Sequence, residues 1–209
     1  MKDKITENNE SRARLIKCAK SEFLEKGYTK ASLRKIAADA GLTTGAVYFF
    51  FKDKEGLLEG VIGKAMYKLM TVLETHFSEE NDADLSLYRQ QDGDHNKFAE
   101  ALVDVIYDNY DEMTILLDRS AGSKYEGFID SIIDRLDGAY IALAEKYAAV
   151  KPGKRVNRKM LHWLTHVQIN AFVHMMQHEK DKESALHFIK PVMDMLIKAW
   201  VEYSLEDDV

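Results

Sequence analysis

The stretch between Ser32 and Leu58 constrains the fold more than any other part of the chain. Ser32 is a favourable N-cap, and Gly41 is suited to the positive φ that commonly ends a helix. The apolar residues between them recur at the spacing of one helical face: Leu33, Ile36, Ala37 and Ala40. This pattern predicts a short amphipathic helix that is closed by a glycine turn.

A second short helix is predicted directly after this turn. Thr43 or Thr44 can cap it, and Val47 and Phe51, spaced i and i+4, define its inner side. Two short helices joined by a tight glycine turn form a helix-turn-helix, whose second helix enters the major groove of DNA. The residues at its start and on its outer side then face the bases: Thr43, Thr44, Gly45, Ala46, Tyr48 and Phe49. The segment therefore predicts DNA binding.

This segment resembles the DNA-binding region of the TetR, or tetracycline-repressor, family of transcriptional regulators. The shared pattern consists of Arg34, Ile36-Ala37, Ala40-Gly41, Gly45, Tyr48, Phe51, Lys54-Glu55 and Leu57. The resemblance implies an all-α protein, in which a three-helix head and a connecting helix lead to a larger helical domain that binds ligands and dimerises. It also implies that Lys54 holds the DNA backbone. Phe49 and Phe50 depart from the family, which usually has polar or mixed residues there.

The candidate DNA contacts combine the helix-turn-helix with the basic residues around it. They are Ser32, Arg34, Thr43, Thr44, Gly45, Tyr48, Phe49, Lys52 and Lys54. Tyr48 either hydrogen-bonds a phosphate or pads the domain, and its place in the shared pattern favours the phosphate. Phe49 either touches thymine methyl groups or shields the domain, and the sequence leaves both interpretations open.

The distribution of charge supports an N-terminal nucleic-acid site, although the net charge of the chain is −6. Residues 1–54 carry 12 basic and 7 acidic side chains, a balance of +5, while the remainder carries 17 basic and 28 acidic ones, a balance of −11. An asymmetry of this kind places phosphate binding at the N-terminal end. We therefore expect a DNA-binding domain at residues 1–55 and a regulatory, ligand-binding and dimerisation domain at 56–209.

Helical periodicity extends through most of the remaining chain, and no strand-like alternation appears. We expect a polar, disordered start over residues 1–10 and a loop or short helix over the acidic stretch 78–95. The longer helices are expected at about 11–26, 54–77, 96–109, 125–149, 157–178 and 184–203, with a short one after Asp111. The glycine at position 27 is the expected C-cap of the first helix.

The last two of these helices are apolar on two sides, so each must be covered twice. One cover is the chain's own core, and we expect the other to be a second subunit in a four-helix interface of a homodimer. The candidate interface residues are Val167, Ala171, Met175, Met193, Leu196 and Trp200. On the last helix, Val192, Met195 and Ala199 lie on a different face from Met193 and Leu196.

Methionine-rich and aromatic faces suggest a pocket for a small apolar or aromatic effector, because methionine adapts to varied ligands. The candidate ligand-binding residues are Met66, Met70, Tyr107, Tyr110, Trp163, His166 and Asn170. Ordinary core packing is the alternative for each of them taken singly.

Two histidine pairs at i, i+4 spacing, His162 with His166 and His174 with His178, raise the question of a metal site. They point about 120° apart around the helix at about 100° per residue. No cysteine or carboxylate cluster joins them, so we expect no metal and no cofactor. No nucleophile elbow, phosphate loop or acid–base pair is found either, which argues against an enzyme.

The sequence lacks an apolar run of membrane-spanning length, and its polar start lacks a signal peptide's apolar core, so we expect a cytoplasmic protein. The favoured function is a repressor that leaves a palindromic operator when a small molecule binds, although activation remains open. The alternatives are a helical dimer regulated by protein–protein contact and a metal-responsive helical protein.

Overall fold

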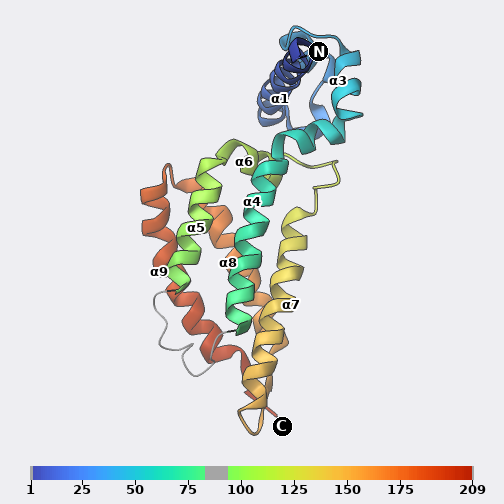
Figure 1. Ribbon diagram of the computed structural model, residues 1–209. Coiled ribbons are helices and arrows are strands. Elements are labelled where there is room, and N and C mark those ends of the chain that lie inside the picture. Colours follow the sequence, from blue (N-terminus) through green and yellow to red (C-terminus); the bar gives the residue numbers. More distant parts are fainter. Residues whose placement is uncertain (1, 83–93, 209) are drawn as a thin grey trace. The chain divides into compact units, whose positions relative to one another are not determined.

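The structure is a computed structural model that describes residues 2–82 and 94–208. Most of these residues are helical (Figure 1). The helices are α1 (Lys2–Lys30), α2 (Leu33–Asp39), α3 (Thr44–Phe51), α4 (Lys54–Asp82), α5 (Asp94–Asp108), α6 (Tyr110–Asp118), α7 (Phe128–Ala149), α8 (Arg158–His178) and α9 (Lys182–Tyr203). The all-α fold class with an N-terminal helix-turn-helix, predicted from the sequence, is confirmed.

The chain divides into two compact units. Unit 1 contains Met1–Lys68 and Asp108–Phe128, and unit 2 contains Leu69–Tyr107 and Ile129–Val209. Helix α4 therefore contributes its first part to unit 1 and its later part to unit 2. The segment that includes α6 packs with the N-terminal helices, although it lies more than 50 residues further along the chain.

The core of unit 1 is built by the apolar faces of its short helices. Helix α1 is interrupted at Gly27, whose φ of +70° and ψ of 165° are not helical, as expected for the predicted C-cap. The side chains that close the core are fully or almost fully buried: Leu15, Ala19, Phe23, Ile36, Ala37, Val47, Leu57, Leu58 and Ile62. This core fixes α2 and α3 against α1 and the start of α4.

Unit 2 is a bundle in which α8 packs extensively against α9. Its core includes Leu136, Leu143, Leu161, Phe172, Met175, Ile189, Met193 and Trp200. Helix α9 begins at a capping box, in which the Asp181 carboxylate accepts from the Ser184 backbone N–H at 2.9 Å. Ion pairs from Lys182 to Asp104 and from Lys190 to Glu100 tie α9 to α5.

Two sequence expectations about local structure were wrong. Residues 2–10 are helical, so α1 begins at Lys2 rather than near residue 11. Two three-residue strands also occur, β1 (Lys154–Val156) and β2 (Leu205–Asp207), paired antiparallel with Arg155 opposite Glu206. Such short strands carry too little periodicity to be recognised. A loop or short helix was expected over residues 78–95. Helix α4 continues through this stretch to Asp82, α5 begins at Asp94, and residues 83–93 lie outside the described part.

Within the described residues, no helix combines the length and the apolar character that crossing a membrane requires.

Candidate nucleic-acid interface

Helix α2 is held at its start by a buried carboxylate that sequence reasoning missed. The Ser32 hydroxyl caps the helix by accepting from the Lys35 backbone N–H at 3.3 Å. The Ser32 backbone N–H itself donates to Glu22 of α1 at 3.2 Å. Glu22 is only 4% exposed and also pairs with the Lys35 ammonium at 3.0 Å. Asp39 on one side and Glu22 on the other raise the pKa of Lys35, so this lysine stays charged.

The turn between α2 and α3 has the geometry that the sequence predicts. Gly41 adopts a φ of +67°, where a glycine avoids the strain of a Cβ atom. The backbone N–H of Leu42 donates to the Ala37 carbonyl at 2.8 Å, and that of Gly41 donates to Ala38 at 3.0 Å. These bonds close α2 and set the direction in which α3 leaves.

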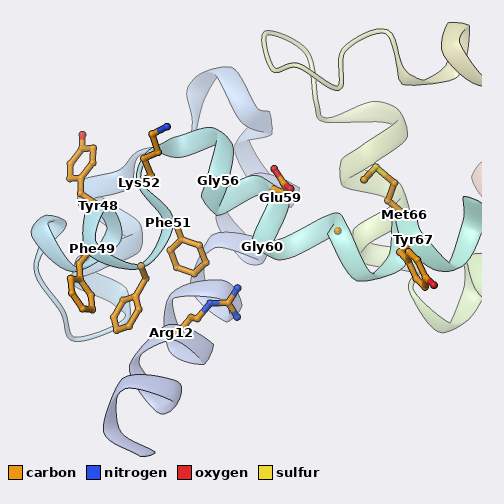
Figure 2. Close-up of a pocket in the computed structure, with 12 residues that line it drawn as sticks. Arg12, Tyr48, Phe49, Phe51, Lys52, Gly56, Glu59, Gly60, Met66 and Tyr67 are labelled. Atoms are coloured by element: carbon orange, nitrogen blue, oxygen red, sulfur yellow. The ribbon is translucent and has the colours of Figure 1, made fainter. Parts of the chain in front are cut away.

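Helix α3 separates a buried face from an exposed one. Val47 and Phe51 face the core, with exposures of 0% and 6%, whereas Tyr48 is 54% and Phe49 is 73% exposed. Thr43 is the N-cap residue, but its side chain makes no capping hydrogen bond, and it is exposed. In Figure 2, Tyr48 and Phe51 leave α3 in opposite directions. The exposed face thus presents a hydroxyl, a phenol and an aromatic ring to solvent.

A tight turn at Lys52 connects α3 to α4. Lys52 has a φ of +69° and a ψ of −47°, and the backbone N–H of Asp53 donates to the Phe51 carbonyl at 2.8 Å. This i to i+2 bond around a residue of positive φ is the rare and strained form of the γ-turn. The Asp53 carboxylate then caps α4 by accepting from the Gly56 backbone N–H at 2.7 Å. Lys52 is exposed, and Figure 2 shows it on the same side as Tyr48.

An open groove runs beside this turn and is lined by aromatic residues of α3 and by α4 (Figure 2). Its lining residues are Arg12, Tyr48, Phe49, Phe50, Phe51, Lys52, Gly56, Glu59, Gly60, Gly63, Met66 and Tyr67. The Arg12 guanidinium lies 5.1 Å from the centroid of the Phe51 ring, a cation–π contact between α1 and α3.

Lys54 occupies a different environment from the other basic candidates. Its ammonium donates to the Thr29 carbonyl at 3.2 Å and lies 4.7 Å from the centroid of the Tyr28 ring. The side chain is half-buried, and this desolvation lowers the pKa of Lys54, while Glu22 acts in the opposite direction. The ammonium therefore holds the start of α4 to the end of α1.

Most of the other predicted DNA contacts lie open to solvent. Those that are exposed are Ser32, Arg34, Thr43, Gly45, Tyr48, Phe49 and Lys52, and Thr44 is intermediate. Ser32 also has a structural task, because its hydroxyl caps α2. The structure thus collects the candidates of α3 and of the γ-turn on one part of unit 1.

The segment from α6 to residue 126 also belongs to this unit, which no local sequence signal indicates. The Arg119 carbonyl accepts from the Tyr28 backbone N–H at 2.8 Å, and the Thr29 hydroxyl donates to the Ala121 carbonyl at 2.6 Å. The Lys124 ammonium pairs with Glu59 of α4 at 2.6 Å. These contacts fasten residues 119–126, here called the strap, to the end of α1 and to the first part of α4.

The predicted ligand-binding residues are divided between the units. Met66 and Tyr110 belong to unit 1, whereas the others belong to unit 2: Met70, Tyr107, Trp163, His166 and Asn170. The Tyr107 hydroxyl donates to the Glu179 carbonyl at 3.1 Å. Trp163 is 59% exposed and Asn170 is also exposed, so these two side chains face solvent in the single chain.

The predicted dimer-interface residues differ in how much surface they offer. Four of them are buried inside the chain itself, with exposures of 0–7%: Met175, Met193, Leu196 and Trp200. Val167 and Ala171 are partly exposed. The large apolar residues that α8 and α9 leave open are instead Trp163, Met195 and Tyr203, with exposures of 59%, 57% and 52%. The face of α9 that carries Met195 is thus its outer face.

Among the described residues, no group of three or more histidine, cysteine, aspartate or glutamate side chains could hold a metal ion.

Comparison with known proteins identifies the helix-turn-helix. The family model of bacterial regulatory proteins of the tetR family matches residues 15–61, which span the second half of α1, all of α2 and α3, and the start of α4. The transcriptional repressor BepR of Brucella suis biovar 1 is 40% identical over 58 residues, which make up 28% of this chain and 28% of BepR. The chain thus matches less than a third of that relative's length.

Similarity also extends beyond the N-terminal segment. The uncharacterized HTH-type transcriptional regulator TtgW of Pseudomonas putida is 30% identical over 117 residues, covering 54% of this chain and 85% of TtgW. A TetR-like regulator from Rhodococcus sp. RHA1 shares the fold, with a TM-score of 0.60 at 15% identity over 92% of this chain and 94% of that one. The chain therefore belongs to the TetR family of DNA-binding transcriptional regulators.

Proposed function

We propose that the protein is a homodimeric repressor that binds a palindromic operator and leaves it when a small apolar or aromatic effector binds. Residues 1–55 recognise DNA, and residues 56–209 carry dimerisation and regulation. The observation that carries the proposal is the exposed face of α3, which presents Thr43, Tyr48 and Phe49 on a segment with a charge balance of +5. Repression is further supported by the name of the relative BepR, a transcriptional repressor.

Each exposed candidate has a role that follows from its chemistry. Tyr48 and Lys52 contact phosphates, since a phenol donates a hydrogen bond and an ammonium neutralises charge. Thr43, Thr44 and Gly45 at the start of α3 meet base edges in the major groove, where hydroxyls pair with donors or acceptors. Phe49 offers apolar surface to thymine methyl groups.

The remaining candidates have positioning or flanking roles. Arg34 is exposed at the start of α2 and supplies a further phosphate contact. Ser32 caps the N-terminal end of α2, which faces the sugar–phosphate backbone of the DNA. Lys54 acts through Thr29 and Tyr28, because its ammonium is already engaged with them.

Dimerisation is supported by the apolar surface of α8 and α9. Trp163, Met195 and Tyr203 are each more than half exposed, and a second subunit that covered α8 and α9 would remove their apolar surface from water. A two-fold dimer places two α3 helices on half-sites about 34–36 Å apart, or a multiple of that spacing. Palindromic operators follow from this symmetry.

Release by an effector requires that the ligand binds more tightly to a conformation in which the two α3 helices of the dimer do not match the spacing of the half-sites. The chain passes between the two units within α4, before α6 and at the start of α7. A ligand that shifts α4 or α6 therefore acts on elements that are packed into unit 1. This supports a population shift as the means of regulation.

The test selects duplexes from a random pool with the full-length protein and then screens small apolar and aromatic molecules for release. We expect an inverted-repeat sequence, bound by two chains, and at least one compound that lowers its affinity. If the selected sequences lacked two-fold symmetry, the proposal of a palindromic operator would be wrong. If no compound released the protein from the selected operator, the proposal of a small-molecule effector would be wrong.

A further inference from the structure

We propose that His162 and His166 of α8 form a binding site for a divalent transition-metal ion, with Asp137 of α7 as its supporting carboxylate. All three residues belong to unit 2, and the site is independent of the DNA-binding function proposed above. The two Nε2 atoms lie 3.2 Å apart. Zinc–imidazole bonds are about 2.0–2.1 Å long, so this separation corresponds to an N–metal–N angle of about 100–106°, close to the tetrahedral value.

The Asp137 carboxylate fixes His162 in the form that a metal requires. The Nδ1–H of His162 donates to Oδ2 of Asp137, so the lone pair of His162 is on Nε2, which faces Nε2 of His166. Metal-binding histidines commonly donate their second ring N–H to a carboxylate in this way, which fixes the ring orientation and raises its basicity. The side chain of Asp137 is only 15% exposed, and its Oδ1 is buried without a hydrogen-bond partner among the described residues.

The surroundings allow an ion to enter and to complete its coordination. The side chain of His162 is 56% exposed and His166 is half-buried, so water can occupy the remaining positions around the ion. Imidazole ligands suit Zn²⁺, Ni²⁺ and Cu²⁺, while Mg²⁺ and Ca²⁺ prefer oxygen ligands. Two protein ligands give a weaker site than the three or four of structural zinc centres.

Metal binding has a defined proton balance. Without the ion, one proton is shared between the two Nε2 atoms, and His166 carries it when His162 is the tautomer described above. Both lone pairs are needed for the metal, so this proton moves to Nδ1 of His166. No oxidant or further reactant is required.

The second pair on α8 provides an internal control. His174 and His178 have the same i, i+4 spacing, and their ring centroids lie 4.2 Å apart at an angle of 34°. His174 also lies against Phe188, with centroids 5.4 Å apart. In the described contacts of this pair, no carboxylate orients either ring. The two pairs have the same spacing in the sequence, and the contact of His162 with the Asp137 carboxylate distinguishes them in the structure.

The test titrates Zn²⁺ into the full-length protein by isothermal calorimetry and records electron paramagnetic resonance spectra with Cu²⁺. We expect His162→Ala and His166→Ala each to lower Zn²⁺ affinity at least about 10-fold, and Asp137→Asn to lower it about 10-fold. The double variant H174A/H178A should retain the affinity within about twofold. Circular dichroism checks that each variant is folded.

The Cu²⁺ spectrum should show coupling to two imidazole nitrogens, and one of them should disappear in His166→Ala. The proposal is overturned if the wild-type protein binds no Zn²⁺. It is also overturned if His166→Ala retains wild-type affinity, or if H174A/H178A is the variant that loses it.

Discussion

The ring of Phe51 occupies the space that a side chain at Gly60 would need. A Cβ atom at Gly60 would lie 2.8 Å from Cε1 of Phe51, closer than such atoms approach, and 3.2 Å from Cδ1, which is a tight contact. A Cβ at Gly56, one turn earlier on α4, would lie 2.0 Å from the Phe51 carbonyl oxygen. The end of α3 therefore packs directly against Gly56 and Gly60 of α4, and the orientation of α3 depends on the absence of a side chain at both positions.

Gly60→Ala should weaken operator binding because the added methyl group displaces Phe51 or α4. Overpacking of this kind costs about 1–3 kcal/mol of unfolding free energy, less the gain from replacing a helical glycine. The matched control is Gly63→Ala, whose Cβ would meet only Glu59 Cγ at 3.9 Å. That variant should gain about 0.5–1 kcal/mol and bind DNA normally. Urea unfolding and fluorescence anisotropy on the selected operator measure both, and equal behaviour of the two variants would contradict the argument.

Lys52 combines backbone strain with an exposed charge, and two substitutions separate them. Lys52→Gly should raise the unfolding free energy by about 1 kcal/mol, because glycine adopts the positive φ without strain. Lys52→Ala keeps the strain and should leave stability nearly unchanged. Both variants lose the charge, so both should reduce the slope of log affinity against log salt by about 1. A slope that stays at the wild-type value in both would exclude Lys52 from the phosphate contacts.

Much of unit 1 could be predicted because its helix caps, turns and buried faces depend on residues that are close together in the sequence. Ser32, Gly41 and Asp53 act as the caps or turn residues that their types favour, and Val47 and Phe51 form the buried face of α3. Each of these outcomes depends on neighbours within a few residues. The outward direction of Tyr48 and Phe49 then follows from helical geometry.

The features that sequence reasoning missed depend on contacts between distant residues. The burial of Glu22 becomes understandable only when the Ser32 N–H, ten residues later, is seen to need an acceptor. Periodicity showed that α9 has two apolar faces, but it could not show that Met193 faces the chain's own core and Met195 faces solvent. The inward position of Lys54 likewise depends on Thr29, 25 residues away.

Lys54→Ala should affect stability more than salt dependence, since the ammonium is bound to the Thr29 carbonyl rather than free. Loss of a charge-assisted hydrogen bond at this half-buried position should cost about 1 kcal/mol after allowance for solvent screening. Lys54→Met keeps the aliphatic stem over Tyr28 and should recover part of that loss. The salt slope of operator binding should fall by clearly less than in Lys52→Ala. An equal fall would show that Lys54 turns outward and holds a phosphate when DNA is bound.

The strap should detach when the contact between Thr29 and Gly122 is disturbed. Gly122 has a φ of +84°, and a Cβ there would lie 2.5 Å from the Thr29 hydroxyl oxygen, which donates to the Ala121 carbonyl. Gly122→Ala therefore adds both backbone strain and a steric clash, whereas Thr29→Val removes only the hydrogen bond.

Hydrogen exchange provides the measurement, because the Tyr28 backbone N–H donates to Arg119 in the strap at 2.8 Å. Its protection should fall in Gly122→Ala and in Thr29→Val, while Thr29→Ser keeps the donor and should retain wild-type protection. The backbone N–H of Lys52, the C-cap residue of α3, donates to the Tyr48 carbonyl at 3.0 Å and should exchange as in the wild type, because this bond belongs to a separate helix. If Tyr28 remained fully protected in both disrupting variants, the strap would be held instead by Lys124, whose ammonium pairs with Glu59 and whose backbone N–H donates to Glu55. The variants Lys124→Ala and Glu55→Gln would then test these two contacts separately.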